Sequence, residues 1–366
     1  MMKKKRFLAS LLAGTMLLGL LAGCGSPNGA ESSGPNGGTS AAPGTSDSGG
    51  EGTYVRKTAE GTLTVGLTDT ADSFDPAVSF NSVGMQLVYD SILVKDPFTG
   101  EITSDIAESW DYTDDCTLVI QFRDDVYFSN GEKMTAEDAL YSLNRMITEN
   151  SRWSTFVDAF NFEKSSAEGQ TLTLVTDEPF GPGLNYLTTR YASVLCKSYA
   201  ESCSDEDFWD KPVGTGPYEC KENVSGSHST YTAKADYWGE VPEISTITTR
   251  YYAEQSSMML DYENGDLDMA FDLSVSDADR ALNTGIEHSV PVLAPVYDTY
   301  TICLPEYVEA FEDIRVRQAI AHALDAAAIT ASAMGVLGVV ADSTLPTGVD
   351  YKISVGGYEY DMEKAQ

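Results

Sequence analysis

The chain has 366 residues, of which 42% are hydrophobic and 10% aromatic, and its formal net charge is −33. So negative a charge excludes nucleic acid as a partner, because little basic surface is left to neutralise phosphates. The acidity could steer cationic ligands, but keeping an exported protein soluble is the simpler explanation.

The chain begins with an export signal. A basic cluster at residues 3–6 precedes a mostly apolar run at residues 7–22, which is too short for a comfortable bilayer span. The segment 21–24, Leu-Ala-Gly-Cys, resembles a bacterial lipobox, in which the cysteine is acylated after cleavage just before it. We therefore expect a signal peptide over residues 1–23 and a lipid anchor at Cys24. An ordinary signal peptide or a short membrane helix is the alternative.

Residues 24–53 form a Gly/Ser/Pro-rich segment with no aromatic and no large aliphatic residue. Such a segment cannot bury enough apolar surface to offset its ordering entropy, so we expect a disordered tether. Its end-to-end distance would be about 30 Å. About 300 residues follow, enough for two domains with sizeable cores.

The first half of this body alternates strand and helix patterns. Leu63, Val65 and Leu67 alternate within 62–67 and predict a half-buried strand, as do the apolar residues at every second position of 117–123. A turn signal at 129–131 precedes a helix pattern, "MTAEDALYSLNRMI". In that helix we expect Thr135 as the N-cap, and a buried stripe of Leu140, Leu143 and Ile147.

The second half continues the mixture. Strand patterns recur at 171–175 and 244–252, and Gly265 to Asp268 would end a helix and start a strand. The stretch "DIRVRQAIAHALDAAAITASAM" predicts a helix capped by Asp313, with its apolar positions at Val316, Ile320, Ala323 and Ala327. The body is therefore mixed α and β.

No catalytic or metal-binding motif is found. The three histidines have no ligand-like spacing, and Gly214-Thr215-Gly216-Pro217-Tyr218 lacks the lysine and helix of a phosphate loop, so it predicts a tight turn before a strand. The acidic residues at 266–279 predict a solvated face rather than a calcium loop. Cys196 and Cys203 could pair, but isolated cysteines are more often buried hydrophobes. We expect a binding protein with no cofactor and no metal, not an enzyme.

Six segments in register resemble family 5 of the extracellular solute-binding proteins, which serve peptide, dipeptide and nickel ABC importers. The segments are "LTVGLTDTADSFDPA", "DIAESWDYTDDCTLVIQFRDDVYFSNGEKMTAEDALYSLNRM", "VGTGPY", "ADYWGEVPEI", "NGDLDMAF" and "DIRVRQAIAHALD". The resemblance covers nearly all of residues 62–366.

The resemblance implies a type II periplasmic-binding-protein fold, with two α/β lobes of mixed sheets that close on a hinge over a ligand. Lobe 1 would cover residues 54–272, with a subdomain inserted at about 93–195, and lobe 2 would begin near Leu273. The implied partners are a short peptide and the permease and ATPase of an importer, and the receptor is expected to be a monomer. It would be anchored outside the cytoplasm.

For the ligand site, the resemblance implies that Phe80, Asn81 and Ser82 run beside a bound peptide backbone, where an ordinary loop is the alternative. Trp153 would line the pocket or pack as a surface aromatic. Trp110 and Trp238 are expected in the core. Family members usually continue past residue 366, so we expect lobe 2 to be incomplete and this chain alone to bind ligand poorly.

Two other functions are alternatives. A nickel chelate or another small solute is the alternative within the family, although the histidines do not cluster. A surface-anchored hydrolase or adhesin would need a nucleophile and base or repeated modules, and neither is seen.

Overall fold

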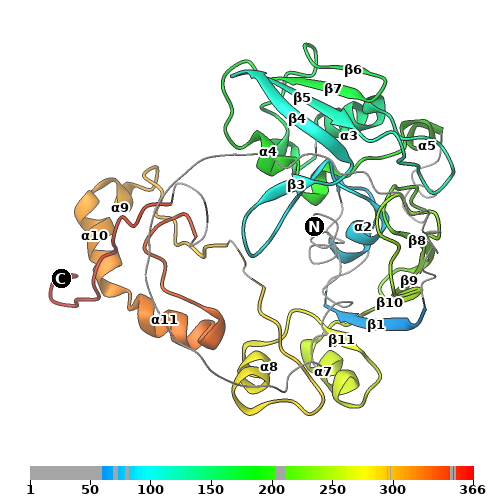
Figure 1. Ribbon diagram of the computed structural model, residues 1–366. Coiled ribbons are helices and arrows are strands. Elements are labelled where there is room, and N and C mark those ends of the chain that lie inside the picture. Colours follow the sequence, from blue (N-terminus) through cyan, green and yellow to red (C-terminus); the bar gives the residue numbers. More distant parts are fainter. Residues whose placement is uncertain are drawn as a thin grey trace, which may run out of the picture.

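The computed structural model describes residues 60–68, 73–78, 82–149, 151–202, 211–294, 296, 298–346, 349 and 352–366. The predicted signal peptide, Cys24 and the tether lie outside these residues. Within the described residues no helix is long and apolar enough to cross a membrane. The fold is mixed α/β, as expected, with two main sheets and a separate C-terminal segment (Figure 1).

The first sheet has five strands in the order β11-β1-β10-β9-β8. β1 lies parallel to β10 and to β11, whereas β10, β9 and β8 are antiparallel neighbours. The predicted strands 62–67 and 244–252 are confirmed as β1 and, in a shorter form, β10. The bounds are β1 Thr62–Leu67, β8 Tyr218–Val224, β9 His228–Ala233, β10 Thr246–Tyr251 and β11 Met269–Ala270.

Two helices cover opposite faces of this sheet. Val65 and Leu67 of β1 are buried together with Met85 of α2 (Ser82–Val88). Gly66 faces the other way, because a Cβ there would lie 2.7 Å from Met258 Cγ in α7 (Gln255–Glu263). The predicted helix end and strand start around Gly265 are confirmed: α7 ends at Glu263 and β11 begins at Met269.

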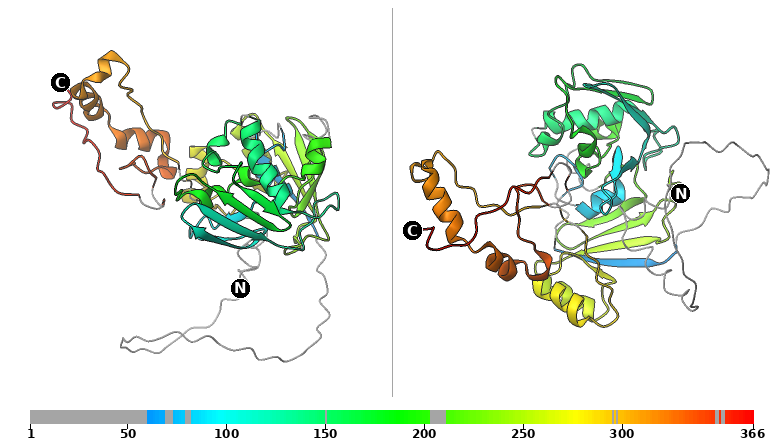
Figure 2. Two further views of the ribbon diagram at one scale, coloured as in Figure 1. Left: turned by 90° about the horizontal axis from the view of Figure 1, so that it is seen from above. Right: turned by 60° about the vertical axis from the view of Figure 1, so that its left-hand side comes forward.

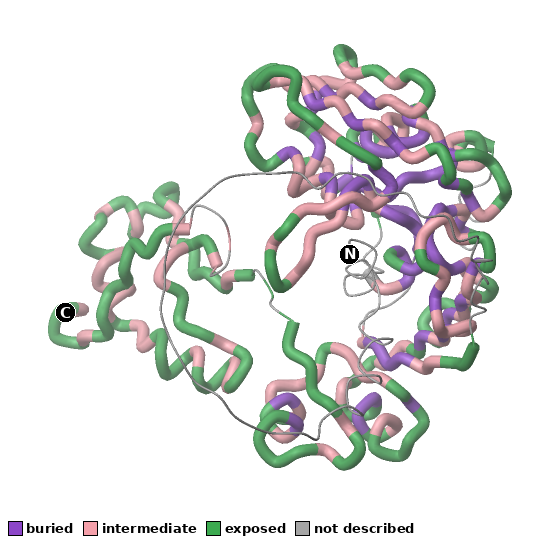
Figure 3. The backbone as a smooth tube through the Cα atoms, in the orientation of Figure 1, coloured by how far each residue is buried: buried purple, intermediate pink, exposed green. Residues whose placement is uncertain are grey.

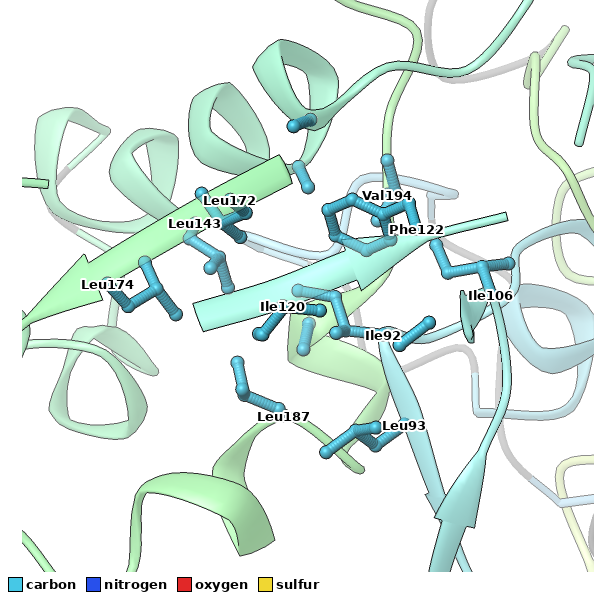
Figure 4. Close-up of a cluster of buried hydrophobic side chains, with 14 of the residues drawn as sticks. Ile92, Leu93, Ile106, Ile120, Phe122, Leu143, Leu172, Leu174, Leu187 and Val194 are labelled. Atoms are coloured by element: carbon cyan, nitrogen blue, oxygen red, sulfur yellow. The ribbon is translucent and has the colours of Figure 1, made fainter. Parts of the chain in front are cut away.

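The second sheet has the order β4-β5-β7-β6, and α3 packs on it. Leu118, Ile120 and Phe122 of β5 are buried, as the alternation predicted, and Leu143 of α3 lies against Ile120 and Leu172 (Figure 4). The bounds are α3 Ala136–Thr148, β4 Ala107–Asp114, β5 Thr117–Phe122, β6 Ser166–Glu168 and β7 Thr171–Val175.

The predicted stripe on α3 is wrong at one end. Thr135 is the N-cap and Leu143 is buried, but Ile147 is 38% exposed. The buried face runs instead through Ala136, Ala139 and Met146.

Short elements connect and border this sheet. Trp110 and Trp238 are half-buried against its core, as predicted, and Cys196 is a free, buried thiol, in agreement with the buried-hydrophobe alternative. Cys203 lies outside the described residues. The bounds are β2 Leu93–Lys95, β3 Ile102–Ser104, η2 Ser154–Phe156, α4 Gly183–Tyr186, η3 Arg190–Ala192 and α5 Lys197–Ser202.

The C-terminal segment stands beside the main body (Figure 2). The single helix predicted from Asp313 on is two helices, α10 and α11, because Asp325 caps a second start by accepting a hydrogen bond from Ala328 N. Asp313 does cap α10, but from residue 282 on no described residue is buried (Figure 3). The bounds are α8 Val275–Asp279, η4 Arg280–Thr284, α9 Glu309–Glu312, α10 Ile314–Ala323, α11 Ala326–Ala333 and η5 Gly335–Leu337.

Candidate functional site

The three parallel strands of the first sheet end at one edge, which we call the carboxyl edge. Leu67 of β1 lies opposite Tyr251 of β10, and Gly66 lies opposite Ala270 of β11. The chain then leaves β1 toward α2 on one face and β10 toward α7 on the other. In open α/β sheets, ligands bind outside the carboxyl ends of strands where the connections diverge in this way. We therefore expect the segment that follows β1 to contribute to a ligand site.

Residues 73–78 of that segment form a turn that is fixed to both cores. Phe74 is buried in the core of the first sheet and Ala77 in the core of the second. Between them, Asp75 accepts two hydrogen bonds from Arg145 of α3, at 2.6 Å to Oδ1 and 2.7 Å to Oδ2. The Asp75 side chain is 1% exposed and that of Arg145 is 15% exposed. This ion pair is thus buried and bidentate, the strongest geometry for such a pair.

Ser151 connects this turn to Trp153. The Ser151 hydroxyl donates to the carbonyl of Ala77 and accepts from the backbone N–H of Trp153 at 3.1 Å. The turn that leads toward Phe80 and the short helix η2 that begins after Trp153 are therefore direct neighbours.

Trp153 belongs to a set of packed rings that we call the aromatic–arginine cluster. The Trp153 and Tyr191 rings are stacked with centroids 4.7 Å apart, and Phe156 stacks on Tyr191 at 4.9 Å. Tyr186 meets Phe156 edge-on at 5.2 Å, and Arg190 lies 4.8 Å above the Tyr191 ring. The cluster is built by η2, α4 and η3.

Arg190 is the charged group of this cluster that could bind a ligand. One N–H donates to Tyr191 Oη at 2.8 Å, but its buried Nε has no hydrogen-bond partner within the described residues. Among the described residues, no carboxylate forms a salt bridge with Arg190. Burial raises the pKa of Tyr191, so its hydroxyl stays protonated. A planar guanidinium that stands over an aromatic ring is a group that can also bind a carboxylate.

The structure places only two of the four predicted site residues, Trp153 and Ser82. Trp153 is placed in the aromatic–arginine cluster. Phe80 and Asn81 lie outside the described residues, and Ser82 is the first residue of α2. Sequence reasoning missed Arg190 and Tyr191. The signal that could have found them is an Arg-Tyr pair without an adjacent acid, in a stretch rich in aromatic residues.

The described residues include no group of three or more His, Cys, Asp or Glu side chains that could hold a metal ion. What the cluster offers is two cations, Arg190 over the Tyr191 ring and Arg152 at 5.1 Å over the Trp153 ring, together with hydroxyl donors and ring faces. These groups can hold and orient a ligand, and the described residues around them supply no nucleophile–base pair.

Comparison with known proteins also indicates a ligand-binding protein. The model of the bacterial extracellular solute-binding proteins of family 5 matches residues 101–366. The dipeptide-binding protein of Escherichia coli is 24% identical over 302 residues, which are 73% of this chain and 54% of the relative. The nickel-binding periplasmic protein of the same bacterium is 24% identical over 287 residues, 76% of this chain and 54% of the relative.

A solved structure of NikA from Staphylococcus aureus in complex with Ni(L-His)2 has a TM-score of 0.66 at 20% identity, covering 84% of this chain and 63% of that one. A likeness at this identity establishes the fold. The chain spans about half the length of the curated relatives it matches.

Proposed function

The chain belongs to family 5 of the bacterial extracellular solute-binding proteins, and from this premise we propose that it captures short peptides outside the cytoplasm for an ABC importer. Two lobes, divided near Leu273, would close over the ligand and present it to the permease and its ATPase. A lipid on Cys24 would keep the receptor, as a monomer, at the membrane surface. The ligand would be handed on unchanged, so no catalysis is required.

The observation that carries this proposal is the aromatic–arginine cluster, which Ser151 connects to the turn after β1. The half-buried guanidinium of Arg190 would supply a charge-assisted hydrogen bond to a peptide carboxylate, and Trp153 would supply a ring face for a neighbouring side chain. Phe80, Asn81 and Ser82 would pair with the peptide backbone. Pairing of that kind gives affinity with little side-chain selectivity.

The same cluster also fits a second ligand class. A metal chelate that brings its own ligands needs a cation for its carboxylates and flat walls, rather than metal-binding side chains. The described residues hold no such side-chain group, and the Staphylococcus aureus relative was solved with Ni(L-His)2. A nickel chelate is therefore the alternative ligand.

The two ligand classes are separated by direct measurement. The protein expressed from its complete gene is purified, and co-purifying molecules are identified by native mass spectrometry. Calorimetry then compares a mixed peptide pool with Ni(II) plus histidine. We expect peptides in the first experiment and saturable peptide binding in the second. A nickel chelate or a sugar in place of peptides, or covalent change of any bound solute, contradicts the proposal.

The role of the cluster is tested with Arg190→Met. A hydrogen bond to a charged group is worth about 1.5–3 kcal/mol, so peptide affinity should fall by about tenfold or more. Arg190→Lys should restore only part of it, since lysine lacks the planar fork. Arg123→Met is the control, because Arg123 also lies 4.8 Å over a ring, that of Trp238, but pairs with Asp125 and contacts no ring of the cluster. Unchanged affinity in Arg190→Met would contradict the assignment of this site.

A further inference from the structure

The bidentate pair of Asp75 and Arg145 is buried where stability alone gives little reason for it. Taking two charges out of water costs several kcal/mol per ion, and well-packed apolar residues often replace such pairs without loss. What a buried pair does supply is a fixed geometry. The Asp75–Arg145 pair fixes the geometry of the turn that contains Asp75.

Besides Arg145, Asp75 contacts only its own turn in the hydrogen bonds that follow. Its Oδ1 also accepts from Ala77 N at 2.8 Å, its backbone N–H donates to Ser73 Oγ at 2.9 Å, and Val78 N donates to its carbonyl at 3.2 Å. These bonds close residues 73–78 into one turn. The position of the Ala77 carbonyl is thereby set by the ion pair.

The Ala77 carbonyl in turn holds Ser151, and Ser151 holds Trp153. The Ser151 backbone N–H donates to Met146 O at 3.1 Å, one residue beyond Arg145 on α3. The side chain of Ser151 is thus held from both ends of the ion pair: through α3 on one side and through the turn on the other. Its hydroxyl has one accepted and one donated bond, so it has no freedom to reorient without losing one.

We propose that Asp75 and Arg145 are positioning residues for the ligand site: through the 73–78 turn and Ser151 they set where Trp153 presents its ring. The proposal rests on the proposed function for its consequence in binding, but the geometry is testable without a ligand. The ion pair also links the segment after β1 to α3 of the second sheet. Trp153 is therefore connected, through Ser151, to the turn that follows β1.

The test uses ¹⁹F NMR of the protein expressed from its complete gene and labelled with 5-fluorotryptophan. Residues 1–366 contain four tryptophans, and Trp153→Phe assigns the Trp153 signal. Arg145→Lys keeps the charge and loses the bidentate fork. We expect the Trp153 signal to shift while those of Trp110 and Trp238 stay, and peptide affinity to fall about tenfold, within the range of coupling between contacting residues. Ser151→Ala should shift the same signal. The double variant should show less than the sum of the two effects.

The matched control is Lys164→Met, which removes an ion pair on the same subdomain whose partners, Lys164 and Asp177, are 61% and 65% exposed. It should leave both the Trp153 signal and the affinity unchanged. An unmoved Trp153 signal in folded Arg145→Lys, or an equal shift of all tryptophans, overturns the proposal. If Arg145→Lys does not fold, the Trp153 signal of Ser151→Ala decides in the same way. Failure of the wild type to bind peptide would refute the proposed function and leave the NMR result to judge this inference.

Discussion

Gly214 and Gly216 let two backbone segments touch. A Cβ on Gly214 would lie 2.1 Å from the carbonyl oxygen of Val88, and one on Gly216 would lie 2.5 Å from the Val88 carbonyl carbon. The Gly216 N–H donates to that carbonyl at 2.8 Å. Neither glycine has a positive φ, so the requirement is close approach and not an unusual turn. The contact joins the end of α2 to the start of β8.

Gly214→Ala should therefore lower the free energy of unfolding by about 3 kcal/mol, as for other overpacked sites. The fixed backbone of Val88 cannot move as a side chain would. Gly181→Ala is the control, since Gly181 has no atom within 4 Å of its added methyl and no positive φ. It should stay within about 0.5 kcal/mol of the wild type. Urea denaturation measures both, and equal midpoints for the two variants would contradict the close-approach explanation.

The Trp153 ring stacks on Tyr191, and its contact with a ligand stays a prediction. Trp153 was singled out from its place near a polar loop. Arg190 was not, because its role depends on having no acidic neighbour in space, which sequence spacing does not show. Likewise, that Cys196 is buried follows from tertiary packing around α5.

At the scale of elements, α3 is the piece on which the second sheet and the candidate site both depend. Its N-terminus is tied to α5 through Asp138. This buried side chain accepts from Thr135 N at 2.9 Å and Thr135 Oγ1 at 2.7 Å, and its other oxygen accepts from Lys197 N at 3.0 Å. One carboxylate thus satisfies a free N–H at the start of each of two helices.

Asp138→Ala should destabilise the protein by about 1–3 kcal/mol, because partly buried donors at two helix starts lose their acceptor. The neighbouring Glu137→Ala is the control: Glu137 is 68% exposed and its pair with Lys197 is a surface salt bridge. Such a pair contributes about 0–1 kcal/mol. Thermal and urea unfolding give the comparison. If Asp138→Ala lowers the free energy of unfolding no more than Glu137→Ala does, the hydrogen bonds of Asp138 to the two helix starts do not stabilise the protein.

The elements themselves were largely predictable, and their failures have physical causes. Alternation of apolar residues found β1, β5 and β7, since one face of each strand is buried. The same reasoning misjudged Ile147, because periodicity marks a helix face but not where its packing partner ends. It also merged α10 with α11, since the capping role of Asp325 looked like one more polar residue in a helical pattern.

At the scale of the whole molecule, the sequence predicted the mixed α/β class and the family, but not how the strands meet. The pairing of Thr62 with Thr246 joins residues far apart in the chain, and no local pattern specifies it. The common end of β1, β10 and β11, which we called the carboxyl edge, follows from that pairing. The division into lobes near Leu273 stays a prediction.

The stability of the whole molecule should depend on pH through its buried tyrosines. Burial raises the pKa of Tyr89, Tyr218 and Tyr231, and for Tyr89 the nearby carboxylate of Asp75 adds to the effect. The folded state therefore keeps these hydroxyls protonated above pH 10, where an unfolded tyrosine loses its proton. Since the unfolded state then binds fewer protons, stability is full below about pH 10 and falls above it.

Tyr89→Phe isolates one of these contributions. Tyr89 Oη is buried and has no hydrogen-bond partner within the described residues, so its removal should cost little at pH 7. Above pH 10 each such tyrosine costs about 1.4 kcal/mol per pH unit, and the variant should lose stability less steeply than the wild type by this amount. Tyr307→Phe, at a side chain 89% exposed, should leave the slope unchanged. Urea unfolding between pH 7 and pH 11 measures all three proteins. Parallel curves for Tyr89→Phe and the wild type would mean that Tyr89 ionises as easily in the folded chain as in the unfolded one.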